Sequence, residues 1–347
     1  MTRADLLVPE LAAHDATGTH TRLVRDLLLE MGVDSVRIVA AIDNGSGEDV
    51  TLVSAWNDPA DLVILQHGIG SLAAEAVIKR RIPCVVNYHN ITPIEFVEPW
   101  DPDHISGLRW GRSQLHQLAP VAVRAIGVSR YNAAELRTAG FDDVRVAPVL
   151  WDLDQPAAAE GIEPHGTETV LFVGRLSANK CQHDLLAALA LLLERRPAVR
   201  MVLVGSAASP SYERCLRGYA ARLGVEHAVD FAGPVSPEAL AAHYAAASAF
   251  VCLSEHEGFC VPIVEAMAAA VPVVAFVAAA VPETVADAGI LIGDKRPATV
   301  AAALDRVLGD PDVRTALVDA GRRRAGDFSL DKGRQHMRAA LEGLVAP

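Results

Sequence analysis

Short apolar runs bounded by turn residues alternate with longer stretches of helical periodicity, and this alternation constrains the fold more than any other feature of the chain. Between two such runs, the stretch 19–31 places Leu23, Leu27, Leu28 and Met31 at helix spacing. Strands that are separated by helices pair in parallel, so the sequence predicts an α/β fold. The predicted strands are 5–8, 35–41, 61–66, 84–88, 125–128 and 144–147, followed by 169–173, 200–204, 229–231, 249–253 and 273–276.

The segment Trp151 to Thr167 interrupts this rhythm with Pro, Gly, Ala and charged residues, which are typical of a linker. At roughly 100 to 200 residues per domain, the chain is long enough for two domains. We expect a first domain at 1–155 and a second at 156–328. Both are predicted to be Rossmann-like and to face each other across a cleft. Ligands of such sheets bind at the carboxyl ends of the strands, so the loops after the strands are the ones to inspect.

Six helices are predicted in the second half, and two of them carry start signals that can be checked. Ser236 precedes Pro237 and Asp310 precedes Pro311, which are good pairs for an N-cap and the first helical position. The helices are expected to start at Lys180, Pro210, Pro237, Pro262, Ala298 and Pro311.

Composition excludes several classes of function. The net charge is −12, so no basic surface for nucleic acid or anionic membranes is expected. No run of about 20 clean apolar residues is present, and the first residues do not fit a signal peptide. The five cysteines are odd in number and lack CxxC spacing, so we expect reduced thiols. These features predict a cytoplasmic protein without stable membrane insertion.

The loop after the predicted strand 169–173 carries two cations. It runs from Gly174 through Arg175 to Lys180, and Lys180 is predicted to open a helix that continues to Leu193. A cation in the first turn opposes the helix dipole, so its presence beside Arg175 favours a bound anion such as a diphosphate. The alternative is that both residues are solvated surface charges.

The loop after the predicted strand 249–253 carries two carboxylates and a helix start. Pro262 fits the first helical position, which leaves the amides of 258–261 as free donors for an anion. Glu257 precedes this helix, and Glu265 is predicted in its first turn. Carboxylates that accept from vicinal hydroxyls, with amides between them, suit a ligand that is both polyhydroxylated and anionic, such as a nucleotide sugar. The alternative is that the acids only favour the helix N-terminus.

These blocks resemble glycosyltransferase family 4, whose members are retaining enzymes with the GT-B fold. The resemblance rests on FVGRLSANK (172–180), LVGS (203–206), FAGPVS (231–236), SEHEGFCVPIVEAMAAAVPVVA (254–275) and VPETVADAG (281–289). It implies that Arg175 and Lys180 bind the donor diphosphate, that Glu257 contacts the transferred sugar, and that Glu265 holds the ribose. It also implies that the amides of Phe259 and Cys260 contact the sugar and the phosphate. The remaining candidates for donor binding are Gly18, Gly174, Gly258 and Val261.

The chain departs from the family pattern at two glycines. Cys260 replaces the second Gly of the usual Gly-Phe-Gly, and Ala270 and Val271 stand where a Gly is expected before Pro272. Cys260 is small enough to leave its backbone amide available, but it adds a thiol near the sugar. A nucleophilic role for Cys260 is the rival interpretation, although retaining enzymes of this class do not need one. Ala270 is expected only to tighten the packing.

In the first half, two loops carry candidate residues. Gly18 would let the backbone approach a phosphate or an acceptor, and Asp15 could accept from an acceptor hydroxyl; otherwise Asp15 or Thr17 simply caps the next helix. The resemblance implies that His89, at the end of the strand 84–88, steadies the sugar and its phosphate. The string YHNITP (88–93) is similar to a branch of the family associated with polysaccharide clusters.

Two motifs imitate other sites. Gly68, Gly70 and Ala73 match GxGxxA, but the strand is not the first one and the next strand ends without an acid for a ribose, which argues against NAD. The DxD strings 101–103 and 152–154 match a metal signature of another glycosyltransferase fold but are expected to be solvated turns.

The last segment, 329–347, resembles the helix that crosses back to the first domain in GT-B enzymes. Its expected buried stripe is Leu330, Met337, Leu341 and Leu344.

The resemblance therefore implies a metal-independent enzyme without a cofactor, which moves a hexose-type sugar from a nucleoside-diphosphate donor to the hydroxyl of a glycan, lipid-linked or small-molecule acceptor. His89, Glu257, Arg175 and Lys180 are its expected catalytic residues. A GT-B epimerase, a glycosyl phosphorylase and a nucleotide-sugar-binding protein without turnover are the alternatives. The donor base (UDP, GDP or ADP), the acceptor and the oligomeric state stay open.

Overall fold

The computed structural model describes residues 2–12, 15–153 and 168–345, and in these the chain forms two compact units. Unit 1 comprises 1–94, 103–151 and 329–347, and unit 2 comprises 95–102 and 152–328. The predicted boundary between 155 and 156 lies outside the described residues. None of the described helices is long and apolar enough to cross a membrane.

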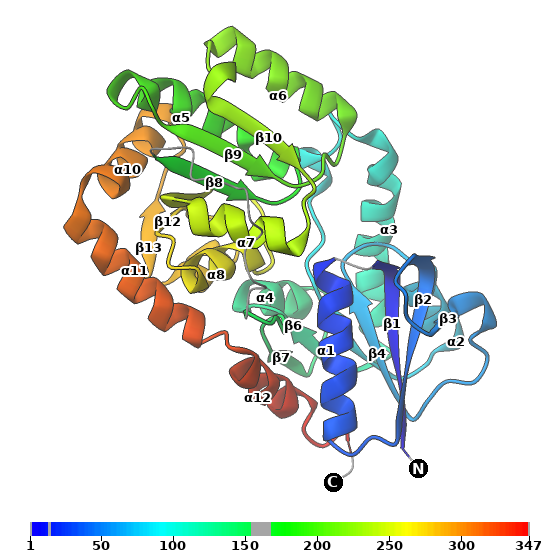
Figure 1. The fold of residues 1–347 in the computed structure, drawn as a ribbon. Helices are drawn as coiled ribbons and strands as arrows, with labels where there is room; N and C mark the ends of the chain where they lie inside the picture. The colour runs from blue at the N-terminus through cyan, green and yellow to red at the C-terminus, as the bar shows by residue number, and fades with distance from the viewer. Residues whose placement is uncertain (1, 13–14, 154–167, 346–347) are drawn as a thin grey trace. The chain divides into compact units, whose positions relative to one another are not determined.

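Unit 1 is built on a parallel sheet of seven strands in the order β3-β2-β1-β4-β5-β6-β7 (Figure 1). The order reverses between β1 and β4, which pair in parallel, so the loops after these two strands emerge side by side at the carboxyl edge. The strands are β1 (Arg3–Ala12), β2 (Ser35–Asn44), β3 (Val50–Leu52), β4 (Leu62–His67), β5 (Cys84–Tyr88), β6 (Ala122–Gly127) and β7 (Val144–Val146).

Helices cover this sheet, and the last helix of the chain belongs to the same unit. Met337 and Leu341 are buried in one cluster with Leu27 and Leu28, and Leu330 and Leu344 pack against it, as the predicted stripe requires. The helices are α1 (Ala16–Glu30), α2 (Leu72–Arg80), α3 (Pro102–Leu118, which begins at the last residue of the unit 2 segment), α4 (Arg130–Thr138) and α12 (Leu330–Leu341), with a short 3-10 turn at Val53–Ala55. Another 3-10 turn, Ile94–Phe96, begins at the last residue before the unit 2 segment 95–102.

Unit 2 is built on a parallel sheet of six strands in the order β10-β9-β8-β11-β12-β13, which reverses between β8 and β11. Its strands are β8 (Thr169–Val173), β9 (Arg200–Val204), β10 (Val229–Gly233), β11 (Ala249–Cys252), β12 (Val273–Phe276) and β13 (Gly289–Ile292). Its helices are α5 (Gln182–Arg195), α6 (Pro210–Leu223), α7 (Pro237–Ala246), α8 (Val261–Ala268), α9 (Val281–Val285), α10 (Pro297–Gly309) and α11 (Pro311–Gly326), with 3-10 turns at Ala178–Lys180 and Glu226–Ala228.

The start signals of two helices are confirmed in detail. The Ser236 side chain accepts from the amide of Ala239, and the Asp310 side chain accepts from the amides of Asp312 and Val313. Two edge strands, β3 and β13, were missed by the sequence analysis. The first strand is longer than predicted, and the helix after it starts at Ala16 rather than at Thr19.

Ala270 does not simply tighten the packing, as the sequence suggested. Its φ is +60°, in the left-handed region that favours glycine. Cys260, the other residue that stands in place of a family glycine, has φ +71°. Both departures therefore put a side chain at a backbone position where a glycine would be less strained.

We expect Ala270→Gly to raise the free energy of unfolding by about 0.5 to 1 kcal/mol, since removing the β-carbon relieves the strain but increases the entropy of the unfolded chain. Ala269→Gly is the matched control, because Ala269 has φ −75° and gains no relief. It should lower the free energy of unfolding instead. Denaturant unfolding of both variants measures the difference, and equal destabilisation by the two would refute the strain.

Candidate functional site

The sheet order of unit 2 brings the two predicted loops together. β8 pairs with β11 in parallel, so the loops that follow them leave the same edge of the sheet as neighbours. The turn after β8 depends on two glycines, because Gly174 has φ +149° and a β-carbon on Gly205 would lie 2.2 Å from the Gly174 carbonyl oxygen. This close approach fixes where Arg175 leaves the sheet, and the Arg175 side chain is exposed.

Lys180 does not open a helix, contrary to the prediction. It ends the 3-10 turn Ala178–Lys180, Cys181 follows with φ +56°, and α5 begins only at Gln182. Lys180 therefore precedes the N-cap of α5 and does not lie in its first turn. It forms an ion pair with the carboxylate of Glu257, with the two side chains only 19% and 10% exposed.

This ion pair keeps a positive charge at the carboxyl edge of the sheet. Burial alone would lower the pKa of Lys180, but the Glu257 carboxylate together with Cys260 and Cys252 outweighs burial, and the pKa is raised. Lys180 is thus charged at neutral pH. A buried cation whose partner is a single carboxylate retains donor capacity for a second anion, since an ammonium group has three protons to give.

Two residues that the sequence analysis missed hold these loops, Asn179 between the two loops and Gln182 within the first. Asn179 Nδ2 donates to the carbonyl of His256 over 3.3 Å, and the Asn179 carbonyl accepts from the amide of Glu255 over 2.8 Å. Gln182 Nε2 donates to the Arg175 carbonyl over 3.0 Å. Asn179 lies within the quoted FVGRLSANK block, but nothing in its residue type showed that it would bridge to the second loop.

The helix after β11 begins one residue earlier than predicted. α8 starts at Val261, so Pro262 takes its second position, and Cys260 is the N-cap. The turn from Gly258 to Cys260 is held by a hydrogen bond to its Phe259 carbonyl, which accepts from Thr284 Oγ1 over 2.6 Å. Its amides lie at the N-terminus of α8, where the helix dipole favours an anion.

Glu265 does not lie in the first turn of α8; it is the fifth residue of this helix. It is 4% exposed, and Tyr244 Oη donates to Glu265 Oε2 over 2.8 Å. Burial and the Glu265 carboxylate raise the pKa of Tyr244 well above its usual range, so the tyrosine stays a hydrogen-bond donor. Sequence analysis missed Tyr244, which was visible only as a break in an apolar run.

The thiol of Cys260 lies 3.9 Å from the thiol of Cys252. The Cys252 thiol, burial and the Glu257 carboxylate raise the pKa of Cys260 well above its usual range. Because the thiolate is the nucleophilic form, this environment disfavours the rival reading of Cys260 as a nucleophile.

Among the described residues, two groups bring potential metal ligands together: Cys181 with His183 and Asp184, and Cys252 with Glu257 and Cys260. In the second group the Lys180 ammonium already neutralises Glu257. Of the two DxD strings, Asp154 lies outside the described residues, as does the side chain of Asp103.

In unit 1, His89 follows β5 and contacts a buried polar cluster at the carboxyl edge. Its Nε2 lies 2.6 Å from Gln66 Oε1, and its ring lies edge-on to His20 with 5.1 Å between centroids. Burial and then His67 lower the pKa of His89 to about 4, so its ring is neutral at pH 7. A neutral imidazole offers one donor and one acceptor.

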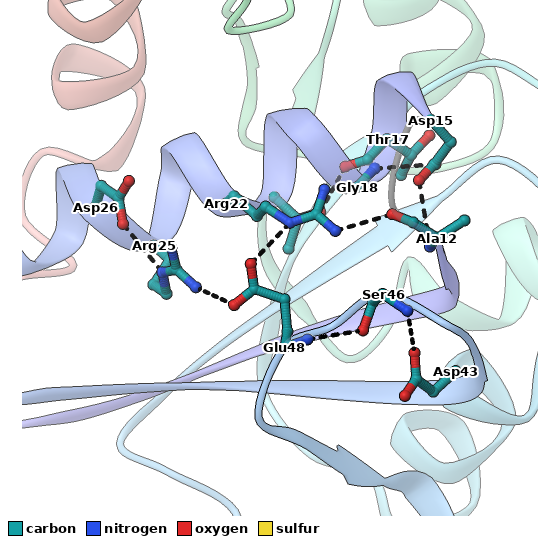
Figure 2. Close-up of polar contacts among 11 residues, drawn as sticks. Ala12, Asp15, Thr17, Gly18, Arg22, Arg25, Asp26, Asp43, Ser46 and Glu48 are labelled. Carbon is teal, nitrogen blue, oxygen red and sulfur yellow. Dashed lines mark hydrogen bonds and ion pairs between the residues drawn. The ribbon is translucent and has the colours of Figure 1, made fainter. Parts of the chain in front are cut away.

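Asp15 caps α1, as the plainer of the two readings expected. One of its oxygens accepts from the amide of Gly18 over 3.0 Å, and the other faces the amide of Ala12 at 3.4 Å (Figure 2). A β-carbon on Gly18 would lie 2.3 Å from Asp15 Oδ1, so the cap itself explains the glycine. That Asp15 binds a hydroxyl of the acceptor substrate and that Gly18 binds the nucleotide-sugar donor stay predictions.

Figure 2 also shows how Ala12, the last residue of β1, is held by α1. Arg22 donates to the Ala12 carbonyl over 2.8 Å and to Glu48 over 3.0 Å, and Arg25 holds the other oxygen of Glu48 at 2.8 Å (Figure 2). The turn after β2 is thereby tied to α1 on the side where the loop after β1 leaves the sheet.

The GxGxxA string serves packing. A β-carbon on Gly70 would lie 2.7 Å from the Gly107 carbonyl oxygen and from the Gly111 nitrogen, because α3 crosses directly over it. The amide of Gly70 donates to the Gly107 carbonyl over 3.0 Å and is therefore occupied. This supports the argument against a dinucleotide site.

Residues 156–324 match the family model described as glycosyl transferases group 1. A D-inositol 3-phosphate glycosyltransferase of Nocardiopsis dassonvillei is 30% identical over 321 residues, which cover 84% of this chain and 73% of the relative. One of Corynebacterium urealyticum is 35% identical over 174 residues, which cover 48% of this chain but only 41% of the relative.

Two solved structures share the fold along nearly the whole chain. Anabaena HepE in complex with UDP and glucose has a TM-score of 0.77 at 19% identity, and the match covers 98% of this chain and 99% of that one. Sucrose-phosphate synthase of Thermosynechococcus elongatus has a TM-score of 0.79 at 19% identity, with 99% of each chain covered. The predicted GT-B fold is thereby confirmed.

Proposed function

Because this chain belongs to the group 1 family of glycosyl transferases, we propose that it is a retaining, metal-independent enzyme that moves a hexose-type sugar from a nucleoside-diphosphate donor to an acceptor hydroxyl. The observation that carries the proposal is the buried ion pair of Lys180 with Glu257 beside the N-terminus of α8. The carboxylates of Glu257 and Glu265 can accept from the hydroxyls of a sugar and a ribose. The Lys180 cation and the amides at the start of α8 can bind a diphosphate.

The donor then lies along the carboxyl edge of unit 2. Arg175 and Lys180 take the diphosphate, together with the amides at the start of α8. Glu265, held by Tyr244, takes the ribose hydroxyls. Glu257 takes the sugar while it orients the Lys180 ammonium.

Catalysis follows from charge development on the leaving group. When the bond between the sugar and the phosphate breaks, negative charge grows on the β-phosphate, and fixed positive charges stabilise it without reorganising. The acceptor hydroxyl attacks from the face that the diphosphate leaves. Its proton passes to a phosphate oxygen, so no protein base is needed. The family resemblance implies that His89 steadies the sugar and its phosphate.

The nature of the donor is the first question to test. HepE was solved with UDP and glucose, which makes UDP-hexoses the first donors to try, with GDP- and ADP-sugars as the comparison. The acceptor of the curated relatives is an inositol phosphate by name, so inositol phosphates head the acceptor screen beside glycan and lipid-linked alcohols.

We expect transfer and release of free nucleoside diphosphate to continue in EDTA, because fixed cations already serve the leaving group. Product analysis should show that the anomeric configuration of the donor is kept. Strict dependence on added Mg²⁺ or Mn²⁺ would overturn metal independence. Formation of an epimerised nucleotide sugar, phosphate-dependent cleavage, or binding without turnover would favour one of the three alternatives.

A further inference from the structure

A chain of buried polar side chains connects the backbone of unit 1 to His89. The Leu150 amide lies 2.9 Å from His20 Nδ1, His20 Nε2 lies 2.6 Å from the side-chain amide of Asn87, and that amide lies 3.0 Å from the amide of Gln66. Gln66 in turn lies 2.6 Å from His89 Nε2. His20, Asn87 and Gln66 are at most 1% exposed, so water does not substitute for these contacts, whereas His89 is partly exposed.

The first link has a fixed direction. A backbone N–H can only donate, so His20 Nδ1 must present its lone pair to Leu150. A ring that accepts at Nδ1 carries its proton on Nε2. Burial agrees with this neutral form, since it lowers the pKa of His20 well below 6.5.

The direction of this first hydrogen bond fixes the orientation of the side-chain amides of Asn87 and Gln66. His20 Nε2–H needs an acceptor, so the Asn87 atom that faces it must be the oxygen. Gln66 must then turn its nitrogen toward that oxygen, and the same nitrogen gives its second proton to His89 Nε2. Oxygen and nitrogen of such amides are assigned from the hydrogen-bond network, and here the Leu150 amide decides the assignment.

We infer that Leu150, His20, Asn87 and Gln66 form a directional hydrogen-bond relay that holds His89 as the Nδ1–H tautomer. Gln66 and Asn87 are then positioning residues, because they act on substrate only through His89. Since Nε2 is occupied by Gln66, Nδ1 is the nitrogen left for a ligand, and it is a donor. His89 therefore recognises an oxygen that accepts a hydrogen bond, from a sugar hydroxyl or a phosphate, and it cannot act as a base at this nitrogen. The role toward substrate rests on the proposed function, whereas the tautomer does not.

The tautomer can be read directly by NMR on the wild-type protein labelled with ¹⁵N-histidine. A protonated ring nitrogen and one with a lone pair resonate far apart, and the His89 signals are identified by their loss in His89→Gln. We expect the proton on Nδ1 of His89 and on Nε2 of His20. A proton on Nε2 of His89 would overturn the relay, whatever the protein's activity.

Two matched substitutions test the direction, because each replaces an amide by a carboxylate that can only accept. In the inferred direction Asn87 only accepts hydrogen bonds within the relay, so Asn87→Asp preserves the relay. Gln66→Glu instead places a carboxylate against two acceptors, Asn87 Oδ1 and His89 Nε2. Gln66→Glu should therefore move the His89 proton to Nε2, and Asn87→Asp should leave it on Nδ1.

The same pair separates positioning from a merely structural role in the transfer reaction. We expect Gln66→Glu to lower kcat/KM about tenfold more than Asn87→Asp does, the equivalent of one hydrogen bond to His89. The reverse order would show the opposite direction, and equal losses would show that the buried amides only support the fold. If no transfer is detected at all, the proposed function fails while the NMR result still decides the relay.

Discussion

The variant Arg175→Ala/Lys180→Met should bind nucleoside diphosphates at least about 100-fold more weakly than the wild type. Each charge-assisted hydrogen bond to a phosphate is worth about 1.5 to 3 kcal/mol, and the variant loses the two cations that lie on the loop after β8. Isothermal titration with UDP, GDP and ADP measures the loss. Lys79→Met is the control, because Lys79 is an exposed lysine of α2 in unit 1.

Lys180→Met is also expected to lower stability, and this effect must be separated from the loss of affinity. Lys180→Met leaves Glu257 buried without its partner, which costs about 3 to 5 kcal/mol of stability. Adding Glu257→Gln removes the uncompensated charge and should recover most of this stability without restoring affinity. If affinity returns together with stability, Lys180 supports the fold of the loop and does not bind the diphosphate.

The two carboxylates should divide their effects between binding and turnover. Glu265→Gln is expected to weaken nucleoside diphosphate and intact donor alike, by about tenfold, because the ribose is common to both and uniform binding is lost. Tyr244 Oη can still donate to the amide oxygen of this variant, so the buried hydroxyl keeps a partner. Nucleotide titrations beside steady-state kinetics report both effects.

Glu257→Gln should instead lower kcat while the affinity for nucleoside diphosphate is kept, because its contact matters as charge develops on the sugar. If Glu257→Gln loses nucleotide affinity and Glu265→Gln does not, the donor is bound in the opposite orientation.

The fold could be predicted because its signals are local and repeated. Each buried strand of a parallel sheet is a short apolar run. N-cap residues such as Ser236 and Asp310 mark a helix start through hydrogen bonds to amides at most three residues further on. The edge strands β3 and β13 were missed.

The sequence indicated the two loops that the pairing of β8 with β11 brings together, but not the contacts between them. Which side chain neutralises Lys180 depends on the pairing of β8 with β11, about 80 residues apart in the chain. The same holds for Glu265, whose partner Tyr244 lies on another helix. Asp15 was weighed both as a cap and as an acceptor ligand, and only its two backbone contacts show that it is a cap.

The most direct test of the central claim is amide hydrogen exchange with and without the nucleoside diphosphate that binds most tightly among UDP, GDP and ADP. If the donor diphosphate binds at the edge where β8 and β11 end, saturation should protect the amides of 174–180 and 258–261 and leave those of α4 in unit 1 unchanged. Binding that leaves both of these loops unprotected, or no binding by any of the three nucleotides, would contradict the account.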